Sequence, residues 1–218
     1  MFDGVCVKHR ACGTTVTMKN WIFPLLLTCT GLVAGTLLYM GSADVMAQAF
    51  ITDYQHPAWS WLTLLGDGTV QVLGCIGMGI FTYLRGQYAL SRAWYWAAPL
   101  SLVAGVAGQV VKWFFGRPRP KLSPELYDFQ WFETTAKLHS FPSGHTLTSF
   151  AIVAMVAAFY PKGRWVLLVL AGLAGLSRIF VGAHWPGDVV CGAFLGYALG
   201  HVLARLKKLS TYKDLTEQ

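Results

Sequence analysis

Charged residues are scarce in this chain. It has only 17 basic and 10 acidic side chains in 218 residues, while apolar residues make up 55% of it and the mean hydropathy is +0.47. An ordinary soluble domain devotes about 25% of its residues to charge, whereas only 12% are charged here. The shortage of charge therefore argues against a soluble domain and predicts an integral membrane protein.

Cysteine patterns and nucleic-acid patterns are also missing. The net charge of +7 comes without a basic stripe that alternates with exposed aromatic residues, so we expect no nucleic-acid partner. The chain has no repeat of fixed period and no low-complexity tract, which indicates a single bundle. The five cysteines are scattered, with neither a disulfide framework nor a metal-binding spacing among them: Cys6, Cys12, Cys29, Cys75 and Cys191.

Uncharged apolar runs dominate what is present. Three of them approach the ~20 residues that a helix needs to cross a bilayer, and the other three do so only if neighbouring residues complete them. The runs lie at 21–43, 68–84, 93–111, 146–161, 165–177 and 189–204. We therefore expect an all-α fold in the form of a six-helix transmembrane bundle.

The distribution of basic residues predicts the orientation. With the N-terminus inside, eleven of the 17 Lys and Arg residues fall in cytoplasmic segments, as the positive-inside rule requires. We divide the chain into a cytoplasmic extension (1–20), a six-helix membrane domain (21–204) and a cytoplasmic basic tail (205–218). The first run is longer than the ~7 to 15 residues of a signal-peptide core, which favours a retained anchor over cleavage at Ala49. Met18 would make a natural start, so residues before it have no expected structural role.

One long connection, 112–145, joins the third and fourth runs, and long loops in compact domains are often functional. Within it, Ser123-Pro124-Glu125 has the pattern of a helix start, and several aromatic residues follow as far as Phe132. We expect a short amphipathic helix at the membrane interface. A loop that simply packs on the bundle is an equally good interpretation.

Three polar clusters share the outer face under this topology: KWFFGRPRP (112–120), FPSGH (141–145) and SRIFVGAHWPGD (177–188). Each cation among them could merely extend toward lipid headgroups. Together with two histidines, however, they indicate an anionic ligand, and the planar fork of arginine suits phosphate oxygens. The four cations are Lys112, Arg117, Arg119 and Arg178.

The residues before the fourth run have the features of an anion site. Ser143 and Gly144 are expected in the first turn of a helix, where free backbone N–H groups bind anions and glycine allows close approach. Ser143 has helix N-capping as its alternative role. His145, in the same turn, has its cationic form disfavoured by the helix dipole and favoured by a bound phosphate, which makes it a candidate proton donor.

A histidine and an aspartate flank the start of the last run. Because Pro186 suits a first helical turn, we expect the helix to begin at Trp185 or Pro186, leaving His184 just outside. Asp188 then lies in the first turn, where its carboxylate can reach one imidazole nitrogen and leave the other free to attack. A pair that only ties the loop to the helix is the alternative. Beside the cations, His184 is a candidate nucleophile.

These clusters also match a known three-part signature. Its parts are Lys112 with Arg119-Pro120, then Pro142-Ser143-Gly144-His145, then Ser177-Arg178 with His184 and Asp188. This pattern resembles the signature of the type 2 phosphatidic acid phosphatase superfamily. The motifs span about a third of the chain, and the flanking runs resemble the integral-membrane branch of the family in layout only.

The resemblance implies a mechanism and a role for each residue. The position matching His184 attacks phosphorus to form a phosphohistidine, the one matching Asp188 supports it, and the one matching His145 protonates the leaving alkoxide. No metal and no other cofactor are implied, because cations and helix N–H groups would stabilise the developing charge. The positions that would hold the phosphoryl oxygens are Lys112, Arg119, Ser143, Gly144 and Arg178.

The expected function is therefore a metal-independent lipid phosphate or diphosphate phosphatase at the outer face of a bacterial-type inner membrane. Its substrate would be a phospholipid, polyprenyl or lipid A phosphate drawn from the surrounding membrane lipids. Two alternatives remain. Phosphotransfer from one lipid to another would use the same phosphohistidine, whereas binding or transport of lipid phosphates without chemistry would need the basic cluster but not the pair His145 and His184. The oligomeric state stays open at this stage.

Overall fold

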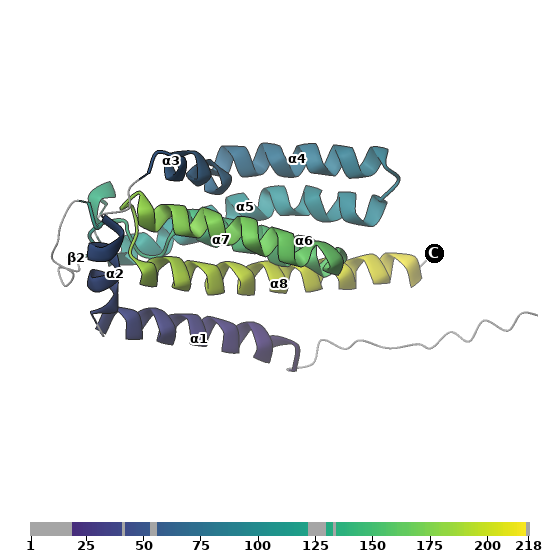
Figure 1. Ribbon diagram of the computed structural model, residues 1–218. Helices are drawn as coiled ribbons and strands as arrows, with labels where there is room; N and C mark the ends of the chain where they lie inside the picture. The colour runs from purple at the N-terminus through teal and green to yellow at the C-terminus, as the bar shows by residue number, and fades with distance from the viewer. Residues whose placement is uncertain (1–18, 41, 53–55, 122–129, 133, 217–218) are drawn as a thin grey trace, which may run out of the picture.

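The computed structural model describes residues 19–40, 42–52, 56–121, 130–132 and 134–216. These residues are mostly helical, which confirms the all-α class, and the long helices lie side by side in one bundle (Figure 1). The long helices are α1 (Lys19–Met40), α4 (Gly68–Leu84), α5 (Tyr88–Phe114), α6 (Gly144–Phe159), α7 (Arg164–Phe180) and α8 (Pro186–Thr216).

Not all of these helices are long enough to cross a bilayer. By length and composition, three spans qualify in the described part of the chain: Tyr88–Phe114, Pro161–Phe180 and Pro186–Lys207. A fourth arises if Ala58–Gly66 and Gly68–Leu84, which are bent by 63° relative to each other, form one broken span. The apolar parts of α1 and α6 are shorter, so the structure supports three or four of the six expected spans by this measure.

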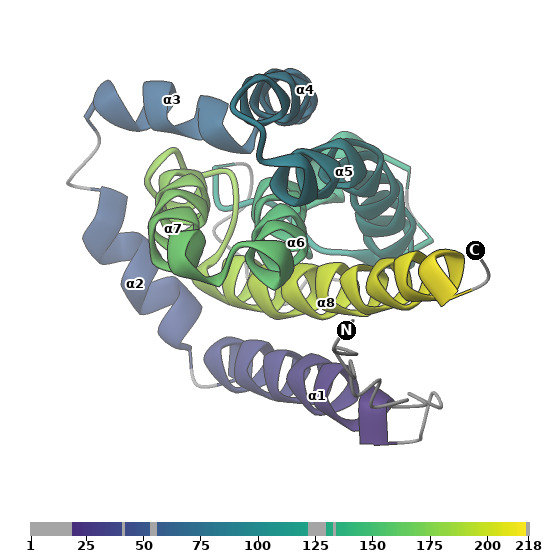
Figure 2. The ribbon, with the colours of Figure 1, turned by 90° about the vertical axis from the view of Figure 1, so that its right-hand side faces the viewer.

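Helix α6 lies at the centre of the bundle, between α5, α7 and α8 (Figure 2). Ten of its 16 residues are buried, because its sequence is apolar on every side and a helix of that kind is stable only when surrounded. The N-terminal residues of α6 are therefore fixed by their neighbours.

Glycines of α8 allow its close contact with α6. A Cβ atom on Gly196 would overlap the backbone carbonyl of Leu147, and one on Gly200 would overlap that of Ala151. The four-residue spacing of these glycines puts them on one helix face. Helix α8 begins at Pro186, which confirms the expected start, and it continues as a helix to Thr216 through the basic tail.

Short elements cover one end of the bundle. Helix α2 (Ala43–Thr52) lies across that end in Figure 1, after a turn in which Ser42 has a φ of 55°. Helix α3 (Ala58–Leu62) and the 3-10 helix η1 (Thr63–Gly66) then lead into α4. All of the polar clusters lie at this end.

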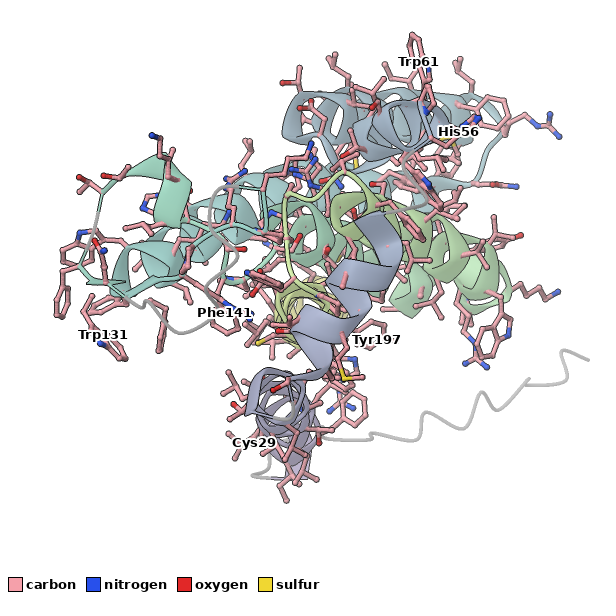
Figure 3. The ribbon with its side chains drawn as sticks, turned by 60° about the vertical axis from the view of Figure 1, so that its left-hand side comes forward. Cys29, His56, Trp61, Trp131, Phe141 and Tyr197 are labelled. Carbon is pink, nitrogen blue, oxygen red and sulfur yellow. The ribbon has the colours of Figure 1, made fainter. Side chains whose placement is uncertain are left out.

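The structure tests only the end of the interfacial helix that was expected in the long loop. Residues 122–129 are outside the described residues, and Gln130–Trp131 (β2) pairs instead with Phe115–Gly116 (β1) in an antiparallel register. A 3-10 helix, η2 (Ala136–Leu138), follows. The exposed ring of Trp131 lies at the periphery of the molecule, as does that of Trp61 (Figure 3), and aromatic rings of this kind favour a membrane interface.

Candidate active site

Hydrogen bonds bring the three polar clusters together. The N–H of Ser140 donates to the carbonyl of Arg117 at 3.0 Å, which joins the first cluster to the second. The N–H of Ser143 donates to the carbonyl of Asp188 at 3.1 Å, which joins the second to the third. Segments that are far apart in sequence thus form one site at the end of the bundle covered by α2.

His184 is buried, with 2% of its surface exposed, in the turn between α7 and α8. Its backbone N–H donates to the carbonyl of Arg178 at 3.2 Å, and its ring Nδ1 lies 2.7 Å from the carbonyl oxygen of Ser140. Because a carbonyl can only accept, Nδ1 must carry the proton. The lone pair of the neutral ring is therefore on Nε2, the nitrogen available for attack.

Asp188 lies in the first turn of α8, as expected, but it is not hydrogen-bonded to His184. Its Oδ2 is 3.8 Å from Nδ1, which is beyond hydrogen-bond length. The carboxylate instead accepts from Arg117 Nη1 at 2.5 Å, from the Ser140 hydroxyl, and from the backbone N–H of Trp185 at 2.9 Å. The expected hydrogen bond that fixes the tautomer is thus made by Ser140, which the sequence gave no reason to select.

The sequence grouped Arg117 with the cations that indicate an anionic ligand, but in the structure its guanidinium is bound by carboxylates of the protein. It is 2% exposed, and its second Nη bonds to Asp44 Oδ2 at 2.7 Å, while its guanidinium lies over the Trp185 ring at 5.4 Å. It is paired with two carboxylates, so it belongs to the support of the site and not to the group of cations expected to meet phosphate. Asp44, the other partner, comes from α2 and was missed in the sequence.

Of the remaining cations, Lys112 and Arg178 lie within electrostatic range of His145 in the first turn of α6. Lys112 Nζ lies 3.7 Å from the position that a Cβ on Gly144 would occupy, so its ammonium is beside the first residue of that helix. Arg178 donates from Nη1 to the hydroxyl of Thr63 in η1 at 2.5 Å. Lys112, Arg119 and Arg178 are close enough to influence one another electrostatically.

The N-terminus of α6 also offers unpaired backbone donors. Ser143 occupies the N-cap position, but its side chain caps no backbone N–H, and its Oγ accepts a hydrogen bond from the hydroxyl of Thr146 at 2.9 Å. The first N–H groups of a helix have no partner within it and attract anions. Gly144 and its neighbours therefore provide an anion site next to the Lys112 ammonium.

His145 lies against the 3-10 helix η1. A Cβ on Gly66 would lie 2.7 Å from the Cβ of His145, so only a glycine permits this contact. His145 is half-buried and within electrostatic range of His184, Arg178 and Lys112. The two candidate catalytic histidines thus lie within electrostatic range of each other and of the same two cations, Lys112 and Arg178.

The protonation of His184 suits a nucleophile. Burial lowers its pKa to about 4; Asp188 opposes this shift, and the charges of Lys112 and Arg178 add to it. At neutral pH the ring is therefore uncharged and keeps the Nε2 lone pair. Among the described residues, no group of three or more His, Cys, Asp or Glu side chains could hold a metal ion.

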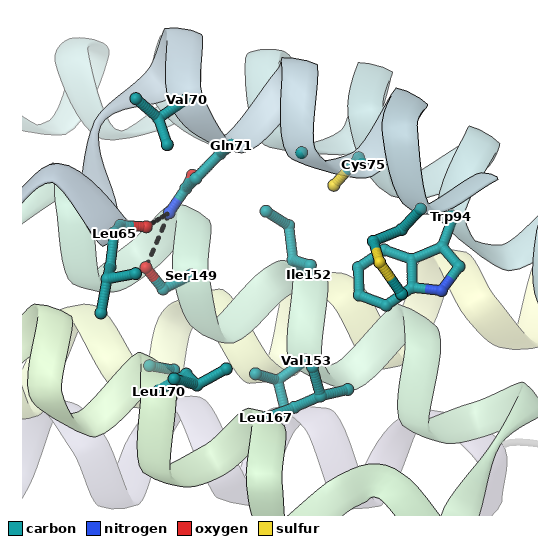
Figure 4. A pocket seen from close by; sticks show the side chains of 13 residues that line it. Leu65, Val70, Gln71, Cys75, Trp94, Ser149, Ile152, Val153, Leu167 and Leu170 are labelled. Atoms are coloured by element: carbon teal, nitrogen blue, oxygen red, sulfur yellow. Dashed lines mark hydrogen bonds between the residues drawn. The ribbon is translucent and has the colours of Figure 1, made fainter. Parts of the chain in front are cut away.

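An apolar cleft of about 250 Å³ begins beneath the site, between η1, α4, α6 and α7 (Figure 4). Its upper end is closed by the amide of Gln71, which donates to the Leu65 carbonyl at 3.2 Å and to the Ser149 hydroxyl at 2.7 Å. Ser149 in turn donates to the carbonyl of His145, one helical turn above. The cleft is therefore about 6 Å, four residues of helix rise, below the catalytic level.

Comparison with known proteins identifies a family. The family model described as the PAP2 superfamily matches residues 93–212. Lipid A 1-phosphatase of Rhizobium etli is 30% identical over 148 residues, which are 61% of this chain and 64% of the relative, so this chain spans just under two thirds of that protein. Lipid A 1-phosphatase of Rhizobium johnstonii is 26% identical over 202 residues, which are 87% of this chain and 82% of the relative.

A solved structure has the same fold. The crystal structure of a transmembrane PAP2-type phosphatidylglycerolphosphate phosphatase from Bacillus subtilis aligns with a TM-score of 0.64 at 20% identity. The alignment covers 86% of this chain and 96% of that one. At this identity, the similarity shows the arrangement of the helices.

Proposed function

This chain belongs to the PAP2 superfamily and is a phosphoric ester hydrolase of the membrane, and from this premise we propose that it removes the 1-phosphate of lipid A through a phosphohistidine on His184. The observation that carries the mechanism is the 2.7 Å contact between His184 Nδ1 and the Ser140 carbonyl. It leaves Nε2 unprotonated in a ring that is neutral at pH 7.

In the first step, His184 Nε2 attacks phosphorus, so that a P–N bond forms and the P–O bond to the lipid breaks. His145 donates its proton to the leaving oxygen, which departs as the lipid alcohol. The imidazole becomes a cation in this step. The Ser140 carbonyl accepts its Nδ1–H, and the Asp188 carboxylate, 3.8 Å away, stabilises its positive charge.

In the second step, water attacks the phosphohistidine while His145 accepts a proton from it. A P–O bond forms, the P–N bond breaks, and inorganic phosphate leaves with the imidazole restored. Lys112, Arg119 and Arg178, together with the free N–H groups at the start of α6, offset the charge that accumulates on the phosphoryl oxygens in both steps.

We further propose that the chain crosses the membrane six times, with residues 1–20 and 205–218 in the cytoplasm and the site at the outer face of a bacterial inner membrane. The excess of Lys and Arg in the corresponding segments supports this orientation. The short α6 fits a membrane domain because other helices surround it, and Ala58–Gly66 lengthens α4. The apolar cleft beneath the site suits a substrate whose tails remain in the bilayer.

The relatives favour lipid A as the first substrate to test, because the second of them matches over most of both chains. Purified protein in detergent would be given lipid A 1-phosphate, phosphatidylglycerol phosphate, phosphatidate and a polyprenyl diphosphate, and free phosphate would be measured. We expect the fastest release from lipid A 1-phosphate. Faster release from another lipid would change the substrate assignment, and phosphate passed to a second lipid without release would indicate a phosphotransferase.

The nucleophile is tested by His184→Ala, which should lower turnover about 10³-fold or more on every substrate, since a covalent step is lost. Wild-type enzyme quenched during turnover should carry phosphate that acid removes and mild base does not, as expected for a P–N bond, and the variant should carry none. Gly77→Ala is a matched control, because nothing lies within 4 Å of its added methyl group. Full activity of His184→Ala would refute the mechanism.

A further inference from the structure

We propose that Asp44 is a positioning residue for the nucleophile: it holds Arg117 and the first turn of α8, and through them Asp188 and Ser140, in the arrangement that aims His184. This inference rests on the proposed function. It assigns a role to α2, the helix that lies across the outer end of the bundle and contributes no residue to the signature.

Both carboxylate oxygens of Asp44 are used. The side chain is completely buried, its Oδ2 accepts from Arg117 Nη2 at 2.7 Å, and its Oδ1 accepts from the backbone N–H of Gly187 at 2.7 Å. Gly187 is the second residue of α8, so its N–H is one of the donors that the helix itself leaves unpaired. Asp44 therefore caps α8 from a segment more than 140 residues away.

Arg117 links Asp44 to the catalytic residues. One guanidinium nitrogen bonds to Asp44 and the other bonds to Asp188, so that two buried carboxylates share one cation. Because the guanidinium is planar and rigid, hydrogen bonds from both of its Nη atoms fix its direction as well as its distance from each carboxylate. Without the Asp44 charge, Arg117 would lose one of the two carboxylates that bind it among the described residues, and the first turn of α8 would lose a partner at Gly187.

The connection continues from Asp188 to the imidazole. Asp188 Oδ2 accepts the Ser140 hydroxyl and the Trp185 N–H, and the Ser140 carbonyl accepts the Nδ1–H of His184. Because every residue in this series of hydrogen bonds is buried and paired, a shift of Arg117 must move Asp188 and Ser140. A misplacement of about 1 Å at a reacting group can cost about 100-fold in rate.

The glycine at 187 supports the same assignment independently. A Cβ on Gly187 would lie 2.9 Å from Asp44 Oδ2 and 3.2 Å from the carbonyl oxygen of Gly35, so any side chain there would push the carboxylate away. Gly187→Ala therefore disturbs the same contact as Asp44→Asn without changing a charge. Both substitutions leave Lys112, Arg119 and Arg178 intact.

The experiment compares Asp44→Asn, Gly187→Ala, the double variant and the control Gly77→Ala. Phosphate release gives kcat and KM. Thermal stabilisation by inorganic phosphate measures how well the cations bind an anion. Stabilisation by orthovanadate also depends on the position of the His184 ring, because vanadate becomes five-coordinate by accepting a bond from the nucleophile. The ratio of vanadate to phosphate affinity is thus a measure of positioning that does not require turnover.

For each single variant we expect kcat to fall by about 10- to 100-fold with KM changed less than threefold. The vanadate affinity should fall while the phosphate affinity stays within threefold of wild type, and the double variant should lose little more than Asp44→Asn alone, since both break one contact. Gly77→Ala should match wild type in every measurement.

Two results would overturn the assignment. One is wild-type kcat and vanadate affinity in Asp44→Asn; the other is a loss of phosphate and vanadate affinity in equal proportion, which indicates general unfolding of the site. If the wild-type protein releases no phosphate from any lipid, the proposed function fails, and the vanadate-to-phosphate ratio still decides the role of Asp44.

Discussion

At the scale of single residues, two tasks that the sequence assigned to Asp188 are divided between two residues: fixing the tautomer of His184 and placing negative charge near its ring. Ser140 fixes the tautomer of His184 through its backbone carbonyl, whereas Asp188 binds Arg117 and supplies negative charge nearby. A backbone carbonyl cannot titrate, so it holds the tautomer wherever the His184 ring is neutral. In the proposed mechanism, the ionisable carboxylate stabilises the imidazole cation that forms when His184 attacks phosphorus.

The neutral His184 should leave a signature in the pH dependence of stability. Its pKa is about 4 in the folded protein and near 6.5 when unfolded. Between these values the unfolded chain binds a proton that the folded chain does not, so stability falls as the pH is lowered from 6.5 toward 4 and is unaffected above 7. Thermal unfolding in detergent at pH 7 and pH 5 should therefore show a larger loss for wild type than for His184→Gln.

Equal losses in the two proteins would mean that His184 has the same pKa in the folded and unfolded states, so that burial does not lower it. A smaller loss for wild type would mean that the fold favours the charged ring, and only that result would count against the attack by Nε2, because a protonated imidazole has no lone pair. The same pair of proteins compared at pH 8 and pH 9 provides the control, since His184 should contribute no difference there.

At the scale of elements, the sequence predicted what depends on local chemistry. The start of α8 at Pro186 and the N-terminal turn of α6 at Ser143 were both expected, because proline and the residues around it restrict the backbone directly. The four-residue spacing of Gly196 and Gly200 can be read from the sequence, and both residues lie against backbone carbonyls of α6. Each of these features can be derived from a few adjacent residues.

Features that depend on tertiary contacts were not predictable in this way. Asp44 is a lone acid just beyond the first apolar run, and nothing in its neighbourhood indicates that it meets Gly187 and Arg117. In the sequence, nothing distinguishes Arg117 from the cations beside it, because its two carboxylate partners lie in distant segments. Ser140 acts through a carbonyl that every residue has, so no residue type could have revealed it.

The 3-10 helix η1 gives a testable case at this scale. Because a Cβ on Gly66 would meet the side chain of His145 at 2.7 Å, Gly66→Ala should displace the proton donor and lower kcat about 10-fold or more, with little effect on phosphate affinity. The measurement is steady-state kinetics with inorganic phosphate as competitive inhibitor. Gly68→Ala, two residues away with open space around its methyl group, should retain wild-type kcat.

At the scale of the whole molecule, all the catalytic segments lie at one end of the bundle and the basic C-terminal helix extends from the other (Figure 1). This polarity follows from the connections: α5 and α7 end at the site, while α6 and α8 begin there. If the basic end is cytoplasmic, the phosphate site must face outward. The charge distribution and the catalytic geometry therefore make one joint prediction about membrane orientation.

Single cysteines at the two ends test this orientation. In a background with all five native cysteines replaced by alanine, Trp131→Cys places a thiol at an exposed position near the site, and Leu206→Cys places one at an exposed position of α8 near the basic end. A membrane-impermeant maleimide added to intact right-side-out vesicles should label Trp131→Cys at once, and Leu206→Cys only after the membrane is permeabilised. The reverse pattern would put the phosphate site in the cytoplasm, where the substrate would have to come from the inner leaflet. Labelling of both before permeabilisation would mean that the chain inserts in two orientations, which the positive-inside distribution argues against.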